Sequence, residues 1–136
     1  MNCGDGIYGI LIGDSTLLAL LATNTSIYPD LAPQTAANPC IVYSESTDEF
    51  NDTKSGVSHL DVNVVQVDIY TNTVAQRKNI SARVRTLLDR YSGTSNSINI
   101  QSIQLVYSFA TIEPEMDKND KRTYRQTMDF KVRQII

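Results

Sequence analysis

Cysteine is scarce in this sequence, which has only Cys3 and Cys40. Cys3 lies in a glycine-rich N-terminal stretch, and Cys40 begins an apolar run. Two cysteines in 136 residues do not make the framework of a disulfide-rich secreted domain. We therefore expect a reducing compartment, with Cys40 as a small buried apolar residue.

Histidine occurs once, at His59, and the usual signatures of catalysis are missing. A single histidine excludes His-rich metal sites, and Cys40 and His59 have no spacing that supports a nucleophilic dyad. The glycines of Gly4–Gly9 follow no strand, so they do not form a phosphate-binding loop. The segment Met116–Asp120 lacks the glycine and the closing glutamate of a calcium loop, and we expect a solvated turn there. We expect no catalytic, cofactor-binding or metal-binding residue, and a protein that is not an enzyme.

Tryptophan is absent, phenylalanine occurs three times, and the net charge is −3. This composition disfavours both a base-stacking platform and a dedicated nucleic-acid-binding face. No apolar run reaches the ~18 residues that cross a membrane, and no basic segment precedes an apolar stretch at the N-terminus. We expect no membrane contact, and the length of 136 residues fits a single domain, residues 1–136.

The N-terminal part of the chain predicts a helix with one interruption. Apolar residues have helical spacing over Ile7–Ala22, and residues 13–15 break the pattern. Asp14 is placed to cap a second short helix. The proline-rich segment 26–39 that follows cannot be a helix or a central strand, so it crosses the surface.

Four strands are predicted beyond the prolines. The first is Cys40–Ser44, and the last, residues 122–136, alternates without a break. The two between them, residues 60–72 and 97–110, each shift phase once, which requires a bulge or a change of partner. The polar segment Glu45–His59 is either a long loop or a protruding hairpin arm with Lys54, Ser55 and Gly56 at its tip.

A second helix is predicted over Thr73–Arg90, between the two strands that shift phase. Thr73 and Gln76 match a capping box, and Gly93 is placed to end the helix. Its apolar face consists of Ile80, Val84, Leu87, Leu88 and Tyr91. The fold class is therefore α+β: a curved, mainly antiparallel sheet of four to five strands, with two helices packed on one face.

Charges are unevenly distributed. Eight of the fifteen acidic residues fall in two polar segments, as Glu45, Asp48, Glu49 and Asp52, and as Glu113, Glu115, Asp117 and Asp120. The helix Thr73–Arg90 carries five basic residues and one acidic residue, Asp89. Solvated loops and helices are often charged in this way. A molecule with surfaces of opposite sign could also pack head-to-tail with copies of itself.

Several landmarks follow one another in a fixed order: Ile27–Asp30 with Ala32 and Pro33, Pro39–Tyr43, Val65–Tyr70, and Tyr124–Arg125 with Asp129–Phe130. In this order they resemble the tail-completion, or tail-terminator, proteins of long-tailed bacteriophages. Together they span almost the whole chain, whereas Met1–Gly6 and Glu115–Lys121 carry none of the resemblance.

The resemblance implies a structural virion protein with no catalytic role. In that family, copies of the protein form a six-fold ring at the head-proximal end of the tail tube. The ring stops tube growth and joins the tail to the head connector. The partners implied are further copies of the chain, the tube protein and the connector, with DNA passing through the lumen without specific binding. It implies localisation at the tail–neck junction of the virion, after assembly in the host cytoplasm.

We expect contacts from two protruding loops, residues 45–59 and 110–122, and from outward residues of the last strand. The candidates are Glu45, Asp48, Glu49, Asp52, Lys54, Glu113, Glu115, Asp117, Lys118, Arg125, Lys131 and Arg133. A head-completion or connector ring of the neck is the nearest alternative. A small enzyme, a ligand-binding α+β domain or a host regulatory module is a more distant one.

Overall fold

A computed structural model describes residues 3–23, 26–31, 37–53, 56–114 and 122–135. Within these ranges the side chains of residues 3, 46–53, 56–61, 113, 114 and 122 are left out of the description. The helices are α1 (Cys3–Ile12), α2 (Ser15–Leu20) and α3 (Val74–Leu88). The strands are β1 (Ile27–Pro29), β2 (Cys40–Thr53), β3 (Gly56–Thr71), β4 (Gly93–Ser95), β5 (Ile98–Pro114) and β6 (Arg122–Ile135).

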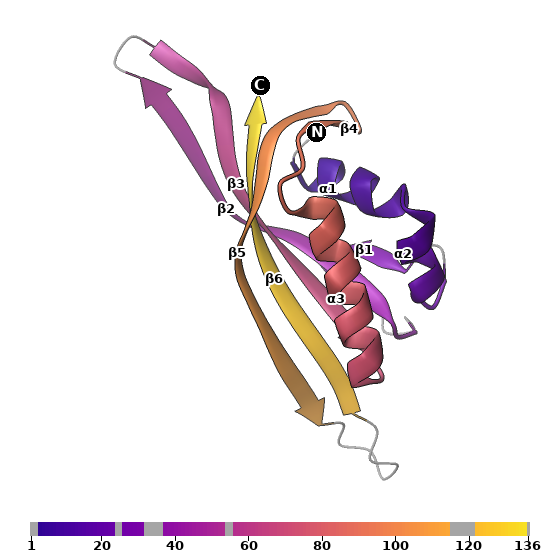
Figure 1. Cartoon of the computed structure of the whole chain (residues 1–136). Coiled ribbons are helices and arrows are strands. Elements are labelled where there is room, and N and C mark those ends of the chain that lie inside the picture. The colour runs from indigo at the N-terminus through magenta and orange to yellow at the C-terminus, as the bar shows by residue number, and fades with distance from the viewer. Residues whose placement is uncertain (1–2, 24–25, 32–36, 54–55, 115–121, 136) are drawn as a thin grey trace.

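The strands form one six-stranded sheet in the order β1-β2-β3-β6-β5-β4. β1 runs parallel to β2, and the other neighbours are antiparallel. The helices lie on one side of this sheet (Figure 1). The α+β class and the mainly antiparallel sheet are therefore confirmed. The two strands beyond the expected four are β1 and β4, which are three residues each and too short to show an apolar period.

The core fills the space between the helices and the sheet. Ile7 and Leu11 of α1, Leu17 of α2 and Phe130 of β6 are fully buried in it. Its other fully buried members come from α3 and from β2, β3, β5 and β6: Ile80, Val84, Leu88, Ile41, Val65, Val67, Ile69, Ile100, Ile103, Met128 and Val132. The apolar face predicted for the helix Thr73–Arg90 is confirmed, because Leu87 and Tyr91 also pack against this core.

The interrupted N-terminal helix is confirmed as α1 and α2. Asp14 is the N-cap of α2, and its Oδ2 accepts a hydrogen bond of 2.9 Å from Leu17 N. α1 begins earlier than predicted, within the glycine-rich stretch. The glycines permit a close approach to β4, since a Cβ on Gly9 would lie 2.5 Å from Ser95 Oγ. Ser95 Oγ in turn donates to the Gly6 carbonyl.

The polar segment 45–59 forms a hairpin arm, the second of its two predicted alternatives. β2 and β3 remain paired out to Thr53 and Gly56, with register shifts between Glu45 and Thr47 and between Phe50 and Asp52. The expected tip, Lys54–Ser55, lies outside the described residues. Polar strands of this kind pair through the backbone, so a low apolar content does not prevent them from forming.

The two predicted phase shifts have different causes. In β5 the register shifts between Ile100 and Ser102, which is the bulge that the sequence pattern required. In β3 the bulge lies on the partner strand: the register with β2 shifts between Glu45 and Thr47, opposite Val65 and Val64, while the pairing with β6 stays in register. The apolar residues of β3 change face at this point, since Val65 belongs to the core cluster whereas Val62 is buried outside it.

The start of α3 follows the sequence pattern, but its end does not. Thr73 Oγ1 accepts from Gln76 N, and Gln76 Oε1 accepts from Asn72 N. The prediction that Gly93 ends the helix is wrong, because the C-cap is Asp89 and Arg90 adopts the left-handed conformation at φ 67°. Arg90 N donates to the Ile103 carbonyl at 2.7 Å. This bond draws the chain onto the edge of β5.

Candidate functional site

Two hairpin arms project from opposite ends of the sheet (Figure 1). The β2–β3 arm extends past the point where β6 ends, since Leu60 is the last residue of β3 that pairs with β6, opposite Ile135. The β5–β6 arm extends the other way, to the pair Pro114 and Arg122. Each molecule thus reaches outward in two opposed directions.

The outer half of β5 is an open sheet edge among the described residues. β4 pairs with β5 only from Ile98 to Ile100, and Arg90 and Tyr91 bond to Ile103. Asp89 Oδ1 then accepts from Leu105 N, and beyond that residue no described strand lies on the side of β5 away from β6. Unpaired edges of this kind are templates for pairing with another chain.

Large apolar side chains are concentrated along this edge. The exposed fraction is 48% for Val106, 57% for Tyr107, 42% for Phe109 and 51% for Ile112. The rings of Tyr107 and Phe109 lie 5.3 Å apart between centroids. Tyr107 and Phe109 pair with Asp129 and Thr127 and lie on the face away from the helices, whereas Ile112 pairs with Tyr124 and lies on the other face. Because single exposed apolar residues are ordinary but four within seven positions of an open strand are not, this row along β5 indicates a contact surface.

A basic groove runs between α3 and β5. One part, about 320 Å³, has Arg77, Lys78 and Arg85 on its helix side and Ser108 and Met128 on its sheet side. The next part, about 520 Å³, contains Arg85 again together with Arg90, Asp89 and Arg133. Since Arg85 and Leu105 line both parts, the two adjoin, and together we call them the α3–β5 groove.

A polar cluster on the face of the sheet away from the helices is centred on Asp68. Its Oδ1 accepts from Thr127 Oγ1 at 2.6 Å and from Arg125 Nε at 3.2 Å. Its Oδ2 accepts from Gln66 Nε2 at 3.0 Å, and lies 3.1 Å from Arg125 Nη2. The Arg125 guanidinium also lies 5.4 Å from the centroid of the Tyr70 ring. Arg125 is therefore engaged within its own chain.

Asp129 lies beside this cluster and is less well satisfied. Its Oδ1 is buried and receives no hydrogen bond from the described residues. Burial raises the pKa of Asp129, and the negative charge of Asp68 raises it further. This carboxylate costs stability when it is ionised.

Glu45 holds the base of the β2–β3 arm against α1. Its Oε1 accepts a hydrogen bond of 2.9 Å from Gly4 N, one of the unpaired N–H groups at the start of α1. Glu45 and Gly4 also border a shallow cavity of about 190 Å³ together with Asp30. Glu45 thus has a structural role as well as its predicted place in the arm.

The predicted contact residues fall into three groups. Among those whose side chains are described, Glu45 binds α1, Arg125 binds Asp68, and Lys131 and Arg133 are half-buried on β6. Asp48, Glu49, Asp52 and Glu113 lie on strands whose side chains are left out of the description. Lys54, Glu115, Asp117 and Lys118 lie outside the described residues, as does the turn expected at Met116–Asp120.

The sequence did not indicate two parts of this surface, the open β5 edge and the α3–β5 groove. The edge depends on how far β4 and Arg90 extend along β5, which no local pattern reveals. The groove had a partial signal in the basic residues of the helix, where Arg77, Ser81 and Arg85 recur every four residues and so share one side.

The described residues contain no group of three or more His, Cys, Asp or Glu side chains arranged to hold a metal ion. Across those same residues, no helix is both long and apolar enough to cross a bilayer.

Comparison with known proteins identifies the family to which the chain belongs. The family model "Tail completion protein gp17" matches residues 5–135. A chain in the solved structure "Virion of native gene transfer agent (GTA) particle" shares the fold, with a TM-score of 0.69 and 20% identity, over 96% of this chain and 92% of that one. No curated protein sequence matches. Since the family match covers nearly the whole of the single sheet and its helices, the chain is a structural virion protein of the phage tail and belongs to the tail completion protein gp17 family.

Proposed function

We propose that copies of this chain form a ring at the head-proximal end of the tail tube, where the ring stops tube growth and joins the tail to the head connector. The observation that carries the proposal is the pair of arms at opposite ends of one sheet in a member of a tail completion family (Figure 1). In the ring, one arm of each subunit points toward the tail tube and the other toward the head connector. A single layer of subunits therefore contacts both partners.

The chemistry of the surface agrees with a passive structural role. A net charge of −3 per copy means that the ring as a whole repels the phosphate backbone, so DNA passes through its lumen without being held. We propose six copies, after the tail-terminator resemblance, and a location at the neck of the virion, reached by assembly in the host cytoplasm. The likeness to a chain of a virion particle agrees with that location.

Termination follows from geometry in this proposal. One face of the ring fits the last ring of the tube, and the other face lacks the docking surface that a tube subunit would offer. The free chain stays monomeric and closes into a ring only on the tube, because its acidic surface opposes self-association. A native mass spectrum of the free chain tests this last step, and a stable free hexamer would contradict it.

Deletion of Thr47–Ser55 tests the role of the β2–β3 arm. The deletion spares Glu45 and its bond to α1, and it leaves the β3–β6 pairing in place, so the chain should still fold. We expect filled heads and unjoined tails in place of complete particles. The full-length variant Asp48→Asn/Glu49→Gln/Asp52→Asn tests the charges of the arm without shortening it. An unchanged yield of virions from the deletion would refute this role for the arm.

Mixing experiments separate this function from a head-side role. The purified chain is added either to tails alone or to filled heads alone, each made without this gene, and the bound chain is counted after sedimentation. Binding to tails supports the proposal. Binding to heads only would assign the chain to the connector side of the joint.

A further inference from the structure

The sheet ends in two open edges at opposite ends of the molecule. β1 pairs with β2 only from Ile41 to Tyr43, and no described strand lies on the outer side of β2 from Thr47 to Thr53. At the other side of the sheet, β5 is open beyond Leu105. Each edge is long enough to pair with another strand over several residues.

We propose that the β2–β3 arm of one copy docks on the open edge of β5 and in the α3–β5 groove of the next copy. This inference rests on the proposed ring and names the contact that builds it. The contact is head-to-tail, because the arm and the groove are different surfaces of the same molecule. Repetition of such a contact closes a ring when the rotation between neighbours permits, and in a closed ring the open parts of β2 and β5 are covered in every copy.

Charge complementarity identifies the occupant of the groove as a second copy. Residues 45–59 contain four acidic residues, Glu45, Asp48, Glu49 and Asp52, against one lysine. The groove is lined by Arg77, Lys78, Arg85, Arg90 and Arg133, with Asp89 as its one acidic member among the described lining residues. An acidic strand that enters this groove meets basic side chains along its length, which favours the correct register and partner.

The dimensions of the two surfaces agree. The seven residues from Thr47 to Thr53 span about 23 Å as a strand at ~3.3 Å per residue. The 15 residues of α3 span about 22 Å at ~1.5 Å per residue. The arm therefore matches the length of the helix wall beside β5, and the exposed row from Val106 to Ile112 lies along the same strand. Docking would cover apolar side chains that one copy leaves in water.

Charge reversal with mixing tests the contact. The groove variant is Arg77→Glu/Arg85→Glu, and the arm variant is Asp48→Lys/Glu49→Lys/Asp52→Lys. Alone, each variant brings like charges together at every contact, and we expect its binding to tail tubes to fall by at least about tenfold. In a mixture of the two, basic arms meet acidic grooves and acidic arms meet basic grooves, so alternating rings should form and binding should return.

The matched control is Asn79→Glu/Thr86→Glu, which adds acidic charge to exposed positions on α3 that do not line the groove. It should bind tubes as the unaltered chain does. Circular dichroism and thermal unfolding confirm that each variant is folded. Tubes are prepared without this gene, and bound copies are counted on gels after sedimentation.

Each outcome separates the inference from the function on which it rests. Loss of binding in each variant with recovery in the mixture supports the arm–groove contact. Full binding by either variant alone, or loss without recovery in the mixture, overturns the contact and leaves the proposed function standing. Failure of the unaltered chain to bind tubes overturns the proposed function. In that case the contact, which forms only in the ring on the tube, is overturned as well.

Discussion

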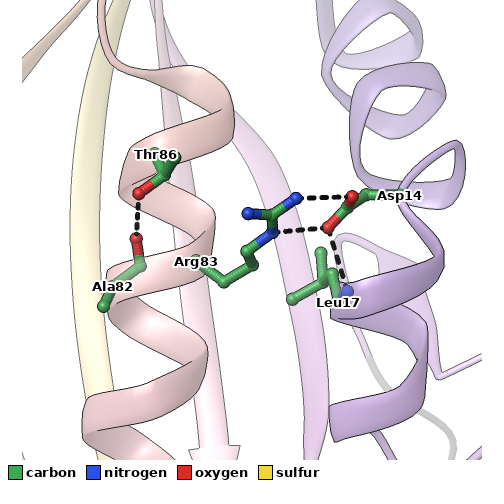
Figure 2. A network of polar contacts seen from close by, with 5 residues as sticks. All are labelled: Asp14, Leu17, Ala82, Arg83 and Thr86. Atoms are coloured by element: carbon green, nitrogen blue, oxygen red, sulfur yellow. Dashed lines mark hydrogen bonds and ion pairs between the residues drawn. The ribbon is translucent and has the colours of Figure 1, made fainter.

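Arg83 of α3 donates two hydrogen bonds to the carboxylate of Asp14, from Nε to Oδ2 at 2.7 Å and from Nη2 to Oδ1 at 2.8 Å (Figure 2). The same carboxylate accepts from Leu17 N and so caps α2. A single side chain therefore caps one helix and fastens it to another. This arrangement fixes the helix layer that supports the α3–β5 groove.

Replacing Asp14 separates its two roles. Asp14→Ala removes the cap and the ion pair, and we expect the free energy of unfolding to fall by about 1–2 kcal/mol. Asp14→Asn keeps an oxygen that accepts from Leu17 N, so the loss should be smaller. Urea unfolding at pH 7 measures the free energy of unfolding of both variants. Equal stability of the alanine variant and the unaltered chain would show that neither contact stabilises the fold.

The contribution of the Asp14 charge to the stability of the fold depends on pH. The hydrogen bonds from Arg83 lower the pKa of Asp14 and outweigh burial, which opposes them, and the Leu17 N–H and the charge of Arg83 lower the pKa further. A lowered pKa in the folded state gives stability that is complete above the unfolded value of about 3.9, and that is lost as the pH falls through the folded value. The difference in thermal midpoint between the unaltered chain and Asp14→Asn should therefore shrink below about pH 4. A difference that is constant from pH 7 to pH 3 would contradict this linkage.

Asp129 should behave in the opposite way. Burial and the nearby Asp68 raise its pKa, so the ionised form costs stability above the folded value, and this cost disappears as the pH falls below it. Asp129→Asn should raise the thermal midpoint at pH 7, with a smaller gain at pH 4. Asp30→Asn is the control, since Asp30 is exposed and asparagine tolerates its positive φ of 61°. A lower midpoint for Asp129→Asn at pH 7 would contradict the prediction.

Asp68 holds the polar cluster of the sheet together. Asp68→Asn leaves Arg125 without its carboxylate partner, and the Arg125 side chain is 29% exposed, so water relieves part of the penalty. We expect a loss of about 2 kcal/mol, below the cost of breaking a fully buried pair. Thr127→Val, which removes one donor and keeps the ion pair, should lose about 1 kcal/mol. Denaturant unfolding measures the free energy of unfolding of the two variants. A smaller loss for Asp68→Asn than for Thr127→Val would contradict the prediction that the ion pair contributes more than the threonine hydrogen bond.

The sequence predicts this fold where local patterns decide it. Helical spacing and Asp14 give the broken helix, and the phase shift near Ile100 requires the bulge in β5. The sequence pattern predicts wrongly where contacts between residues far apart in the chain determine the structure. The sequence predicts that Gly93 ends α3, but the helix ends at Asp89, where the bond from Arg90 N to the Ile103 carbonyl draws the chain toward β5.

The candidate site was predictable in charge but not in shape. The acidic segment 45–59 and the basic helix are visible in the sequence, and their opposite signs favoured head-to-tail packing. The open edge of β5 exists because β4 stops after three residues, which depends on the path of the whole chain. Arg125 looked like an outward contact residue because strands alternate. Its pairing with Asp68 depends on a residue 57 positions away in the sequence.

The apolar row on β5 gives the last prediction. Tyr107→Ser/Phe109→Ser removes two exposed rings from the outer edge of β5, and exposed substitutions of this kind usually change stability by less than about 0.5 kcal/mol each. The thermal midpoint should therefore stay close to that of the unaltered chain, whereas binding to tail tubes should fall. Leu31→Ser is the control, since Leu31 is 83% exposed and lies apart from the row, and it should leave both properties unchanged. Sedimentation with tubes measures binding, and calorimetry measures stability. If the double variant binds tubes as well as the unaltered chain does, these rings face solvent in the assembled tail and the edge of β5 is not a contact surface there.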